Sequence, residues 1–560
     1  MANPTSEGTG STQEMFFGRR EILNLIFKIF VPIQLQAATE PDITTSSGVE
    51  WRKQLLNLAL VSRAFSDPAL DCLWTHLDSL TPLLKLHPGM RDIDGLYYFI
   101  GDIDDPKAAK FHRYARAVRS IAFNAGGNTT HPISLAGMSW LGQQLKGRAL
   151  LPGLQRVQFK DPNCDSVHMG LLPLILSPSI ETVGFNGSFL SANTFHTYSL
   201  PIVCGGAPQL KHLLLEDYGV VSHTGIWGSL PTFLRPLQRL ESLTLLLPNT
   251  LSMPTAFLYQ LIPNLRNITS LYLDTHTGSH SGSRNSVFAF GGTGELQCLT
   301  SLELVNRSGP NVCPCYPASL LKRATSMVFH ISTSLTGSNQ SRQAIETLST
   351  MKNLKTVKIV PRTREVVIAP DNLKGFLRSL SLETFEIRGG TLFAENGVCG
   401  GGLSVLIDAA YAQDGEGTIR RPLRSLHTPI WRHTYHFPPI RTLVDIARNA
   451  IGLHHLSLCI DSTWIGPNNQ TLKSLMETWE EPAVPSTLRH LEIADFRTSN
   501  FEPAEYRDLA RLLDTIFPNL ESLTMIDHDP SRDKKWDEHW KLIEEYRRMR
   551  RSLRIHGLSF

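Results

Sequence analysis

One apolar phrase recurs along most of this chain and sets the strongest limit on its fold. The phrase reads apolar, any, any, apolar, any, apolar, and its copies begin at Val118, Leu154, Ile180, Leu210, Leu240, Ile268, Leu299, Ala324, Leu354, Leu382, Leu453, Leu488 and Leu520, with a degraded copy, LRSLHT, at 423–428. Successive copies start about 25 to 36 residues apart, with one step of about 41 before Leu423. Each repeat of this length can bury its apolar side only against its neighbours. The period therefore predicts an irregular solenoid over 114–530.

Each copy has the period of a β-strand, and the intervals between copies have helical patterns. In LESLTL at 240–245 the outward side chains alternate with inward leucines, as a strand requires. Helical spacing is found in PTAFLYQLIPNL, RQAIETLSTMKNL, RTLVDIARNAIGL and YRDLARLLDTIFPNL, and each ends in a turn just before the next strand. The predicted fold class is α/β, with parallel strands and outer helices, and the strand phrase resembles that of leucine-rich repeats.

Three intervals are rich in Gly, Ser or Pro, at 279–294, 389–417 and 463–485, and we expect protruding loops there. The glycine runs at 291–294 and 400–402 lack the Lys-Ser or Lys-Thr of a phosphate loop, so they also indicate flexible loops.

The N-terminal part has a different pattern from the repeats. The segments EILNLIFKIF at 21–30 and QLLNLALVSRAFSDPALDCLWTHL at 54–77 place apolar residues at helical spacing, and Asp67-Pro68 predicts the start of a third helix. Three short helices in about sixty residues make a small core, for which a binding partner is a natural source of stability. We assign 15–90 to this helical module, with an insert at 32–50, after a disordered N-terminus at 1–14.

These residues resemble the F-box of a large class of fungal F-box proteins. The shared pattern is E-I-L-x-x-I-F, then L-x-x-L-A-x-V-x-x-x-F, then A-L-x-x-L-W, and it covers about the first ninety residues. Arg19-Arg20 stands where Leu-Pro is usual. The resemblance implies docking to a Skp-type adaptor and, through it, to a cullin scaffold. The chain would then be the substrate-recognition subunit of an SCF-type (Skp–cullin–F-box) ubiquitin ligase.

Two sets of site residues follow from this interpretation. The adaptor-binding set is Ile22, Leu23, Ile26, Phe27, Leu55, Leu58, Val61, Phe65 and Trp74, of which the last two could equally serve the module's own core. The target-binding set consists of outward residues at strand starts: Lys211, His212, Glu241, Ser242, Lys355, Thr356, Arg489 and His490. Their charges do not share one sign, so the protein target stays unknown. The alternative is that the helices only cap the array and the chain is an interaction scaffold without a ligase role.

Composition excludes several classes of partner. The 54 basic and 51 acidic side chains leave a net charge of +3, which is too small to indicate nucleic acid. The eight cysteines are scattered along 560 residues, which indicates reduced thiols. The N-terminus does not have the pattern of a secretory signal, and no apolar run reaches the ~20 residues of a membrane span. We therefore expect a cytoplasmic or nuclear protein, or one found in both, with no membrane partner.

No motif for catalysis, a cofactor or a metal stands out. Cys313-Pro-Cys315 lacks a second cysteine pair, and nothing in the sequence requires His427, His433 and His436 to meet Cys399. An acidic cluster, Asp102, Asp104 and Asp105, lies in the connector at 91–113 without the turn glycine of a calcium loop. We expect a non-catalytic adaptor with no cofactor.

Residues 531–560 predict a capping helix and tail. Trp540, Leu542, Ile543, Tyr546 and Met549 form its expected apolar side, and the pairs Asp537–Lys541 and Glu544–Arg548 suit a solvent-facing helix. The last repeat of a solenoid needs such a wet outer surface. The alternative, that Arg547, Arg548, Arg550, Arg551 and Arg554 hold nucleic acid, lacks interleaved stacking aromatics.

Overall fold

The structure is a computed structural model, and it divides into two compact units, Met1–Leu251 and Ser252–Phe560. The residues that it describes are 23, 25–27, 46–123, 133–160, 170–219, 224–249, 253–275, 296–306, 325–331, 351–361, 367–368, 373–374, 376–377, 382–388, 391–392, 401–411, 423–428, 437–463, 471–480, 482, 484–497, 500–526 and 535–555.

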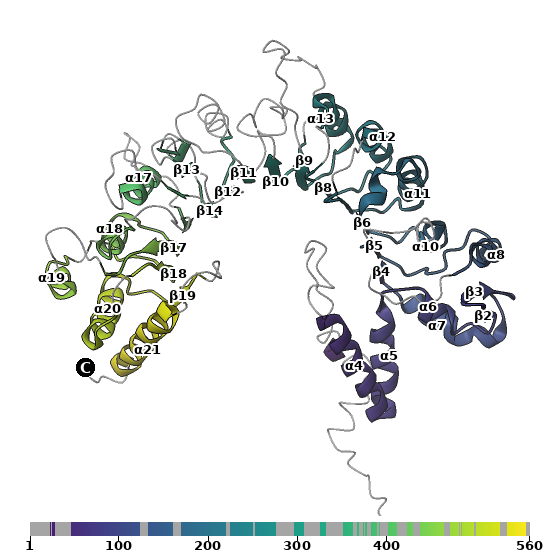
Figure 1. The fold of residues 1–560 in the computed structure, drawn as a ribbon, viewed down its shortest axis with the longest axis horizontal. Coiled ribbons are helices and arrows are strands. Elements are labelled where there is room, and N and C mark those ends of the chain that lie inside the picture. The colour runs from purple at the N-terminus through teal and green to yellow at the C-terminus, as the bar shows by residue number, and fades with distance from the viewer. Residues whose placement is uncertain are drawn as a thin grey trace, which may run out of the picture. The chain divides into compact units, whose positions relative to one another are not determined.

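The first unit contains a parallel sheet in the order β1-β4-β5-β6-β7-β8, with helices between the strands (Figure 1). Its strands are β1 (His76–Leu77), β2 (Met90–Ile93), β3 (Leu96–Phe99), β4 (Ser120–Phe123), β5 (Arg156–Phe159), β6 (Thr182–Asn186), β7 (His212–Glu216) and β8 (Ser242–Leu247). Its α-helices are α4 (Ser46–Val61), α5 (Arg63–Thr75), α6 (Thr81–Leu84), α7 (Ala109–Ala117), α8 (Leu135–Leu145), α10 (Leu172–Ile175), α11 (Leu200–Gly206) and α12 (Thr224–Leu234).

The second unit repeats the plan in the order β9-β10-β11-β12-β14-β16-β17-β18-β19, again with parallel pairs. Its strands are β9 (Ser270–Thr275), β10 (Ser301–Asn306), β11 (Ser326–Ile331), β12 (Thr356–Pro361), β13 (Val367–Ile368), β14 (Thr384–Ile387), β15 (Thr391–Leu392), β16 (Ser425–His427), β17 (His455–Ile460), β18 (His490–Asp495) and β19 (Ser522–Met525). Its α-helices are α13 (Thr255–Leu261), α17 (Gly401–Ala410), α18 (Arg441–Asn449), α19 (Leu472–Glu477), α20 (Pro503–Ile516) and α21 (Lys535–Ile555).

The recurring phrase explains the register of both sheets. Each strand that contains a copy begins at the third residue of that copy, so the last two apolar residues face the helices. In the pair β7–β8, Leu213 lies opposite Leu243 and Leu215 opposite Leu245, and all four side chains are buried. Burial of one such leucine contributes about 1.5 to 3 kcal/mol, and a slip of one residue would turn the whole row outward. The predicted α/β solenoid of parallel strands is therefore confirmed.

Most of the predicted helices are present, but two predicted loops are wrong. α13, α18 and α20 coincide with three of the four helical stretches, whereas most of RQAIETLSTMKNL lies outside the described residues. The interval 389–417 contains α17, because Leu403, Leu406 and Ile407 have helical spacing and are buried. The interval 463–485 contains α19, which begins with a capping box at Thr471. The third interval, 279–294, lies outside the described residues.

The predicted start of the third N-terminal helix, at Asp67-Pro68, is also wrong. α5 begins at Arg63, because Ser62 is its N-cap and accepts a hydrogen bond from the backbone N–H of Phe65 at 3.3 Å. Pro68 lies inside this helix. The end of the F-box-like pattern then continues directly into β1, so the sheet of the first unit already begins at His76.

The segment that we expected to be a connector contains an ordered hairpin. β2 and β3 are antiparallel, and their turn residues Asp94 and Gly95 have φ values of 52° and 78°, as a two-residue hairpin turn requires. Tyr97 and Phe99 of β3 are buried, and the Tyr97 carbonyl accepts a hydrogen bond from the Ser134 backbone at 2.9 Å. This hairpin therefore packs firmly against the start of α8.

The C-terminal helix α21 buries a different face from the one that we expected. Trp540, Ile543 and Arg547 are buried, whereas Leu542, Tyr546 and Met549 are exposed. The Trp540 indole donates a hydrogen bond to the Asp495 carboxylate of β18 at 2.7 Å. The predicted Glu544–Arg548 pair forms at 3.1 Å, although Glu544 itself is buried.

A buried ion network holds α21 on α20. The Arg547 guanidinium, 1% exposed, donates to the Asp514 carboxylate of α20 at 3.1 Å, to the Glu544 carboxylate at 2.5 Å and to the Leu520 carbonyl at 2.9 Å. Arg550 and Arg551 also approach Asp514, at 3.6 and 3.7 Å. Three of the five tail arginines thus serve this internal network. Spacing along α21 could not predict this network, because Asp514 comes from another helix.

Replacement of Asp514 by Ala should therefore loosen the C-terminal end of the second unit. Removal of one partner from a buried ion pair costs about 3 to 5 kcal/mol, because the other charge stays buried. Hydrogen–deuterium exchange of α21 and β19 would measure the loss of protection. The control is Arg548→Ala, whose side chain is 73% exposed and whose loss should change stability by less than about 0.5 kcal/mol. Equal protection in Asp514→Ala and the wild type would contradict this account.

Candidate functional site

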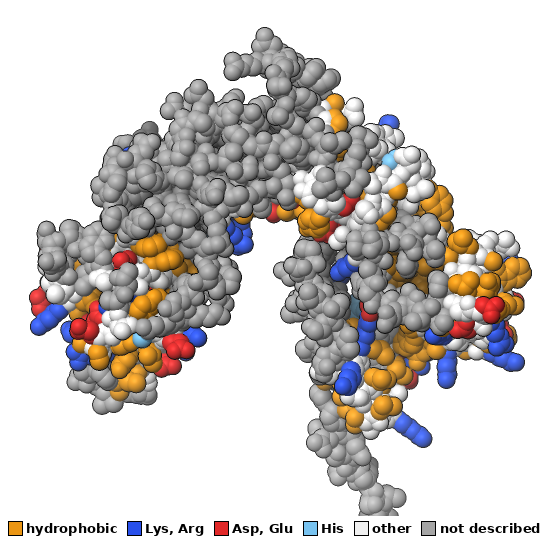
Figure 2. Space-filling model, viewed as in Figure 1, with side chains coloured by type: hydrophobic (Ala, Val, Ile, Leu, Met, Phe, Trp, Pro, Cys, Tyr) orange, Lys and Arg blue, Asp and Glu red, His pale blue; other side chains and the backbone are white. Residues whose placement is uncertain are grey.

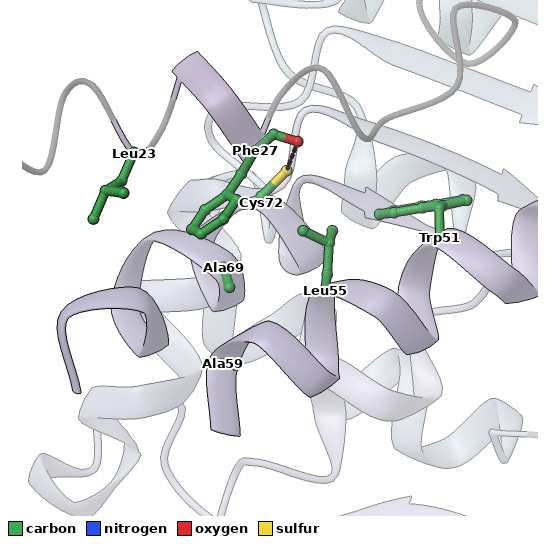
Figure 3. Packing of buried hydrophobic residues seen from close by; sticks show 7 residues of the cluster. All are labelled: Leu23, Phe27, Trp51, Leu55, Ala59, Ala69 and Cys72. Atoms are coloured by element: carbon green, nitrogen blue, oxygen red, sulfur yellow. Dashed lines mark hydrogen bonds between the residues drawn. The ribbon is translucent and has the colours of Figure 1, made fainter. Parts of the chain in front are cut away.

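The N-terminal module has a closed core of its own, built from both sides of the insert. Figure 3 shows the side chains of Leu23, Phe27, Trp51, Leu55, Ala59, Ala69 and Cys72, which form one buried cluster. The Cys72 thiol lies 3.6 Å from the Phe27 carbonyl, which joins the first helical segment to α5. Phe65 meets Phe27 edge to face, with ring centroids 5.9 Å apart. These contacts hold the three helical segments together.

The structure separates the predicted adaptor-binding residues into several groups. Leu23, Phe27 and Leu55 are buried in the core, where they are 0 to 3% exposed and cannot reach a partner. Ile26, Leu58 and Phe65 are half-buried against that core. Val61 is 68% exposed, whereas Trp74 stacks on Tyr114 of α7 with ring centroids 4.9 Å apart. Ile22 lies outside the described residues.

A second apolar line remains in contact with solvent. Leu25, Leu56, Leu60 and Val61 are 64, 47, 78 and 68% exposed, respectively. Leu56 and Leu60 are four residues apart on α4 and therefore share one face, with Val61 beside them. We call Leu56, Leu60 and Val61 the α4 face. Leu25, Leu56 and Leu60 were absent from the set predicted from sequence.

The sequence contained only part of the information needed to find this face. The run QLLNLALV is apolar on more than one side, so spacing alone does not show which line is internal. The line of Trp51, Leu55 and Ala59 is internal because it meets Phe27 and Ala69. The neighbouring row of side chains on α4, which includes Leu56 and Leu60, therefore faces solvent.

The module is fixed to the sheet of the first unit by contacts on two sides. On one side Trp51 meets the ring of His76 in β1, with centroids 6.2 Å apart, and Arg52 pairs with Asp78 just beyond that strand. On the other side Arg113 of α7 pairs with Asp67 and Asp71 of α5, both at 3.0 Å. Together with the Trp74–Tyr114 stack, these contacts join the helices to the first repeat.

His76 lies at the centre of this junction. Its Nδ1 atom is 2.6 Å from the Ser120 hydroxyl of β4. Burial lowers the pKa of His76 from 6.5 to about 4, with smaller contributions from Arg156 and Arg52. The imidazole is therefore neutral in the folded protein at neutral pH.

This shift predicts an acid-sensitive junction. In the unfolded chain His76 binds a proton near pH 6.5, but in the folded chain it does so only near pH 4, so stability is full above pH 6.5 and is lost as the pH falls towards 4. The loss should be on the order of 2 to 3 kcal/mol. Thermal unfolding between these pH values, compared with His76→Gln, would measure it. If the stability of both proteins depended equally on pH, the prediction would be wrong.

The predicted target-binding residues lie at the starts of strands, as expected, but several are already paired. Lys211, Lys355 and Arg489 form ion pairs with Glu181, Glu383 and Glu521, at 3.0, 3.3 and 3.5 Å, respectively. In each case the partner occupies the equivalent position of a neighbouring repeat. Such half-exposed pairs contribute little stability, so a bound partner can replace them at small cost.

The remaining predicted residues follow the same rows. His212 and Ser242 lie directly opposite each other in the first unit, and Glu241 comes just before Ser242. Thr356 lies opposite Ser326 in the second unit, where His490 stacks on His455 with ring centroids 4.4 Å apart. The His490 ring also contacts the Ser522 hydroxyl at 2.8 Å. The structure therefore places the eight residues in two separate sets, one in each unit.

Sequence reasoning missed a histidine-rich area on the strand face of the second unit. His427, His455 and His490 come from three neighbouring strands, β16, β17 and β18. Burial is the main cause that lowers the pKa of His427 and of His455. His427 lies 3.9 Å from the Glu492 carboxylate. Two of these histidines are visible in the phrases LHHLSL and LRHLEI, but only the pairing of the strands in register brings them together.

The structure gives the acidic cluster of the connector ordinary structural roles. The Asp102 carboxylate accepts from the Asp104 backbone at 3.0 Å, Asp105 accepts from the Lys107 backbone at 2.8 Å, and Asp104 pairs with Arg148 at 2.7 Å. Among the described residues, no group of three His, Cys, Asp or Glu side chains could hold a metal ion. Cys313, Cys315, Cys399, His433 and His436 lie outside those residues.

Comparison with known proteins adds to the description of the fold. No family model and no curated protein matches the chain. Among solved structures, the chain is similar to one in the crystal structure of the TLR13-ssRNA13 complex, with 12% identity and a TM-score of 0.33 over 73% of this chain and 56% of that one. It is also similar to one in the crystal structure of the Rad7 and Elc1 complex in yeast, with 12% identity and a TM-score of 0.27 over 88% of this chain and 97% of that one.

The first of these matches spans only about half, 56%, of the other chain's length. The observed strand and helix order is that of a leucine-rich-repeat-like solenoid. Within the part of the chain that the structure describes, no helix has the length and apolar character needed to cross a bilayer.

Proposed function

We propose that this protein is a non-catalytic substrate-recognition subunit of an SCF-type ubiquitin ligase. In this proposal the α4 face binds a Skp-type adaptor, which connects the chain to a cullin scaffold, and the strand face of the repeats binds a protein target. The observation that carries the proposal is that Leu56, Leu60 and Val61 are 47 to 78% exposed on a module whose core is already complete.

The α4 face has the character of a binding surface. Single exposed leucines are common on protein surfaces, but here three large apolar side chains share one end of one helix. The core of the module is built from other residues. The same residues belong to the segment that resembles an F-box. A helical adaptor that covers this face would remove its apolar surface from water.

The mechanism proposed here is an increase in effective concentration. The ion pairs and ring contacts at the junction fix the module on the first repeat, so an adaptor on α4 would have a defined position relative to the strand face of the first unit. A target bound there would be held near the conjugating enzyme, and its modification would become an intramolecular event.

The strand face of the first unit suggests what kind of target fits. Glu181, Lys211, His212, Glu241 and Ser242 offer charges of both signs and hydroxyl or imidazole groups. A mixed surface of this kind suits the polar surface of another protein, whereas a uniform polyanion would meet the carboxylates of Glu181 and Glu241 beside Lys211. We therefore propose a protein target and no nucleic acid.

Co-purification with a Skp-type adaptor tests the proposal. The wild-type chain should co-elute with the adaptor, and Leu56→Asp combined with Leu60→Asp should abolish co-elution, because two carboxylates would be buried in the interface. Hot-spot residues at the centre of an interface contribute about 2 kcal/mol or more each, so the expected loss of affinity is above about a hundredfold. Leu55 is unsuitable for this test, because its side chain is 0% exposed and its replacement would unfold the core.

The matched control is Leu135→Asp on α8. Leu135 is 68% exposed and also lies on a helix of the first unit, but it is not part of the α4 face. This variant should bind the adaptor like the wild type. A wild-type chain that does not co-elute would favour the alternative, an interaction scaffold without a ligase role. Normal co-elution of the double variant would show that the α4 face does not bind the adaptor.

A further inference from the structure

Two imidazole rings are stacked on the strand face of the second unit. His455 of β17 lies directly opposite His490 of β18, and the ring centroids are 4.4 Å apart with 20° between the ring planes. Leu456 and Leu491, which follow the two histidines, also lie opposite each other and are buried, so the register of the strands fixes the stack. His455 is exposed and His490 is half-buried, so solvent and a binding partner can reach the pair.

The fold holds these two rings too close for both to be charged readily. A first proton produces an imidazolium over the face of a neutral ring, and a cation is attracted to an aromatic face. A second proton would place two positive charges on rings whose centroids are only 4.4 Å apart. Histidines that interact this strongly bind their protons in two separate steps that belong to the pair. As the pH falls, the pair therefore gains its first positive charge well before its second.

Charged groups of both signs surround the pair. They are His427 on β16, Glu492 on β18, and Arg424, His454, Arg489 and Glu521 at the positions just before β16, β17, β18 and β19, respectively. Arg489 is paired with Glu521 at 3.5 Å, and Glu492 lies 3.9 Å from His427. Figure 2 likewise shows side chains of both signs on the visible surface of the C-terminal part. Both carboxylates near the stack thus already have a neighbour that is or can become positive, whereas Arg424 is exposed.

These neighbours keep His455 uncharged near neutral pH while the face is free. Burial lowers the pKa of His455, and the charges of His490, His427 and His454 lower it further, whereas Glu492 raises it. The pKa of His454 is also lowered, first by burial and then by Arg489 and Arg424. A carboxylate that approached the stack would act against these cationic neighbours and would favour the protonated form. The face is thus suited to bind a carboxylate and a proton together.

We propose that the His455–His490 pair is a proton-dependent docking point for a carboxylate of the target protein. With one proton bound, the pair offers a charged N–H donor, and the exposed Arg424 lies just before the strand next to His455. Glu492 and Glu521 in the same area disfavour an anion of higher charge, such as a phosphate group. This inference rests on the proposed function only in that it takes the strand face as the target surface, and it requires no adaptor.

Titration of the individual histidines tests the coupling of the pair. Exchange of the ring C2 hydrogen for deuterium, measured by mass spectrometry on the full chain, reports the protonation of each histidine. In the wild type His455 and His490 should titrate in two separated steps, and in His455→Gln the remaining His490 should titrate in a single step. The control His212→Gln, which removes a strand-face histidine of the first unit, should leave both steps in place. Single, independent steps for both rings of the wild type would overturn the proposal.

Binding of a labelled peptide of ten glutamates to the full chain tests the docking point. Its affinity should rise about threefold or more as the pH falls from about 7.5 to about 6, because binding takes up a proton. His455→Gln combined with His490→Gln should remove most of this rise at an unchanged melting temperature, whereas His212→Gln should retain it. An equal rise in the double variant and the wild type overturns the proposal, and so does tighter binding of the same peptide with phosphoserine in place of one glutamate. No adaptor is present in either experiment, so these outcomes leave the test of the ligase role unaffected.

Discussion

Burial of leucine between neighbouring strands is the interaction on which both units depend. The inward pair of each phrase, such as Leu213 and Leu215, is covered by the equivalent pair of the next strand and by the helices. No repeat can satisfy this requirement by itself, and the first and last strands each lack one neighbour. In the first unit the N-terminal module covers β1 through Trp51 and His76. In the second unit α21 covers the end at β19, with Trp540 and Ile543 buried beneath it.

The two covering elements share a second apolar side. A helix that ends a sheet must be apolar towards the sheet, but α4 and α21 are apolar on a second side as well. In α4 the inner line of Trp51, Leu55 and Ala59 is followed by Leu56 and Leu60. Water is a poor solvent for such a second apolar side.

Much of the fold could be predicted from the sequence, because a strand with alternating apolar residues has only one way to face the helices. The phrase located the strands that it marks, each of which begins at the third residue of its copy, although β1, β2, β3, β13 and β15 lack it. The faces of the helices were harder, because QLLNLALV and the tail are apolar on several sides. The buried face of each helix is set by residues distant in sequence, which are Phe27 and Ala69 for α4 and Asp514 for α21. Spacing within one helix contains no information about those partners.

The same reasoning explains why the strand face is polar yet nearly balanced in charge. Equivalent positions of neighbouring repeats lie side by side, so like charges at those positions would repel along the whole row. Lys211 beside Glu181, Lys355 beside Glu383 and Arg489 beside Glu521 avoid this repulsion. Because these pairs are half-exposed they are weak, and their side chains can turn to an incoming surface at little cost. Charges of opposite sign at these neighbouring positions thus keep the repeats from repelling one another.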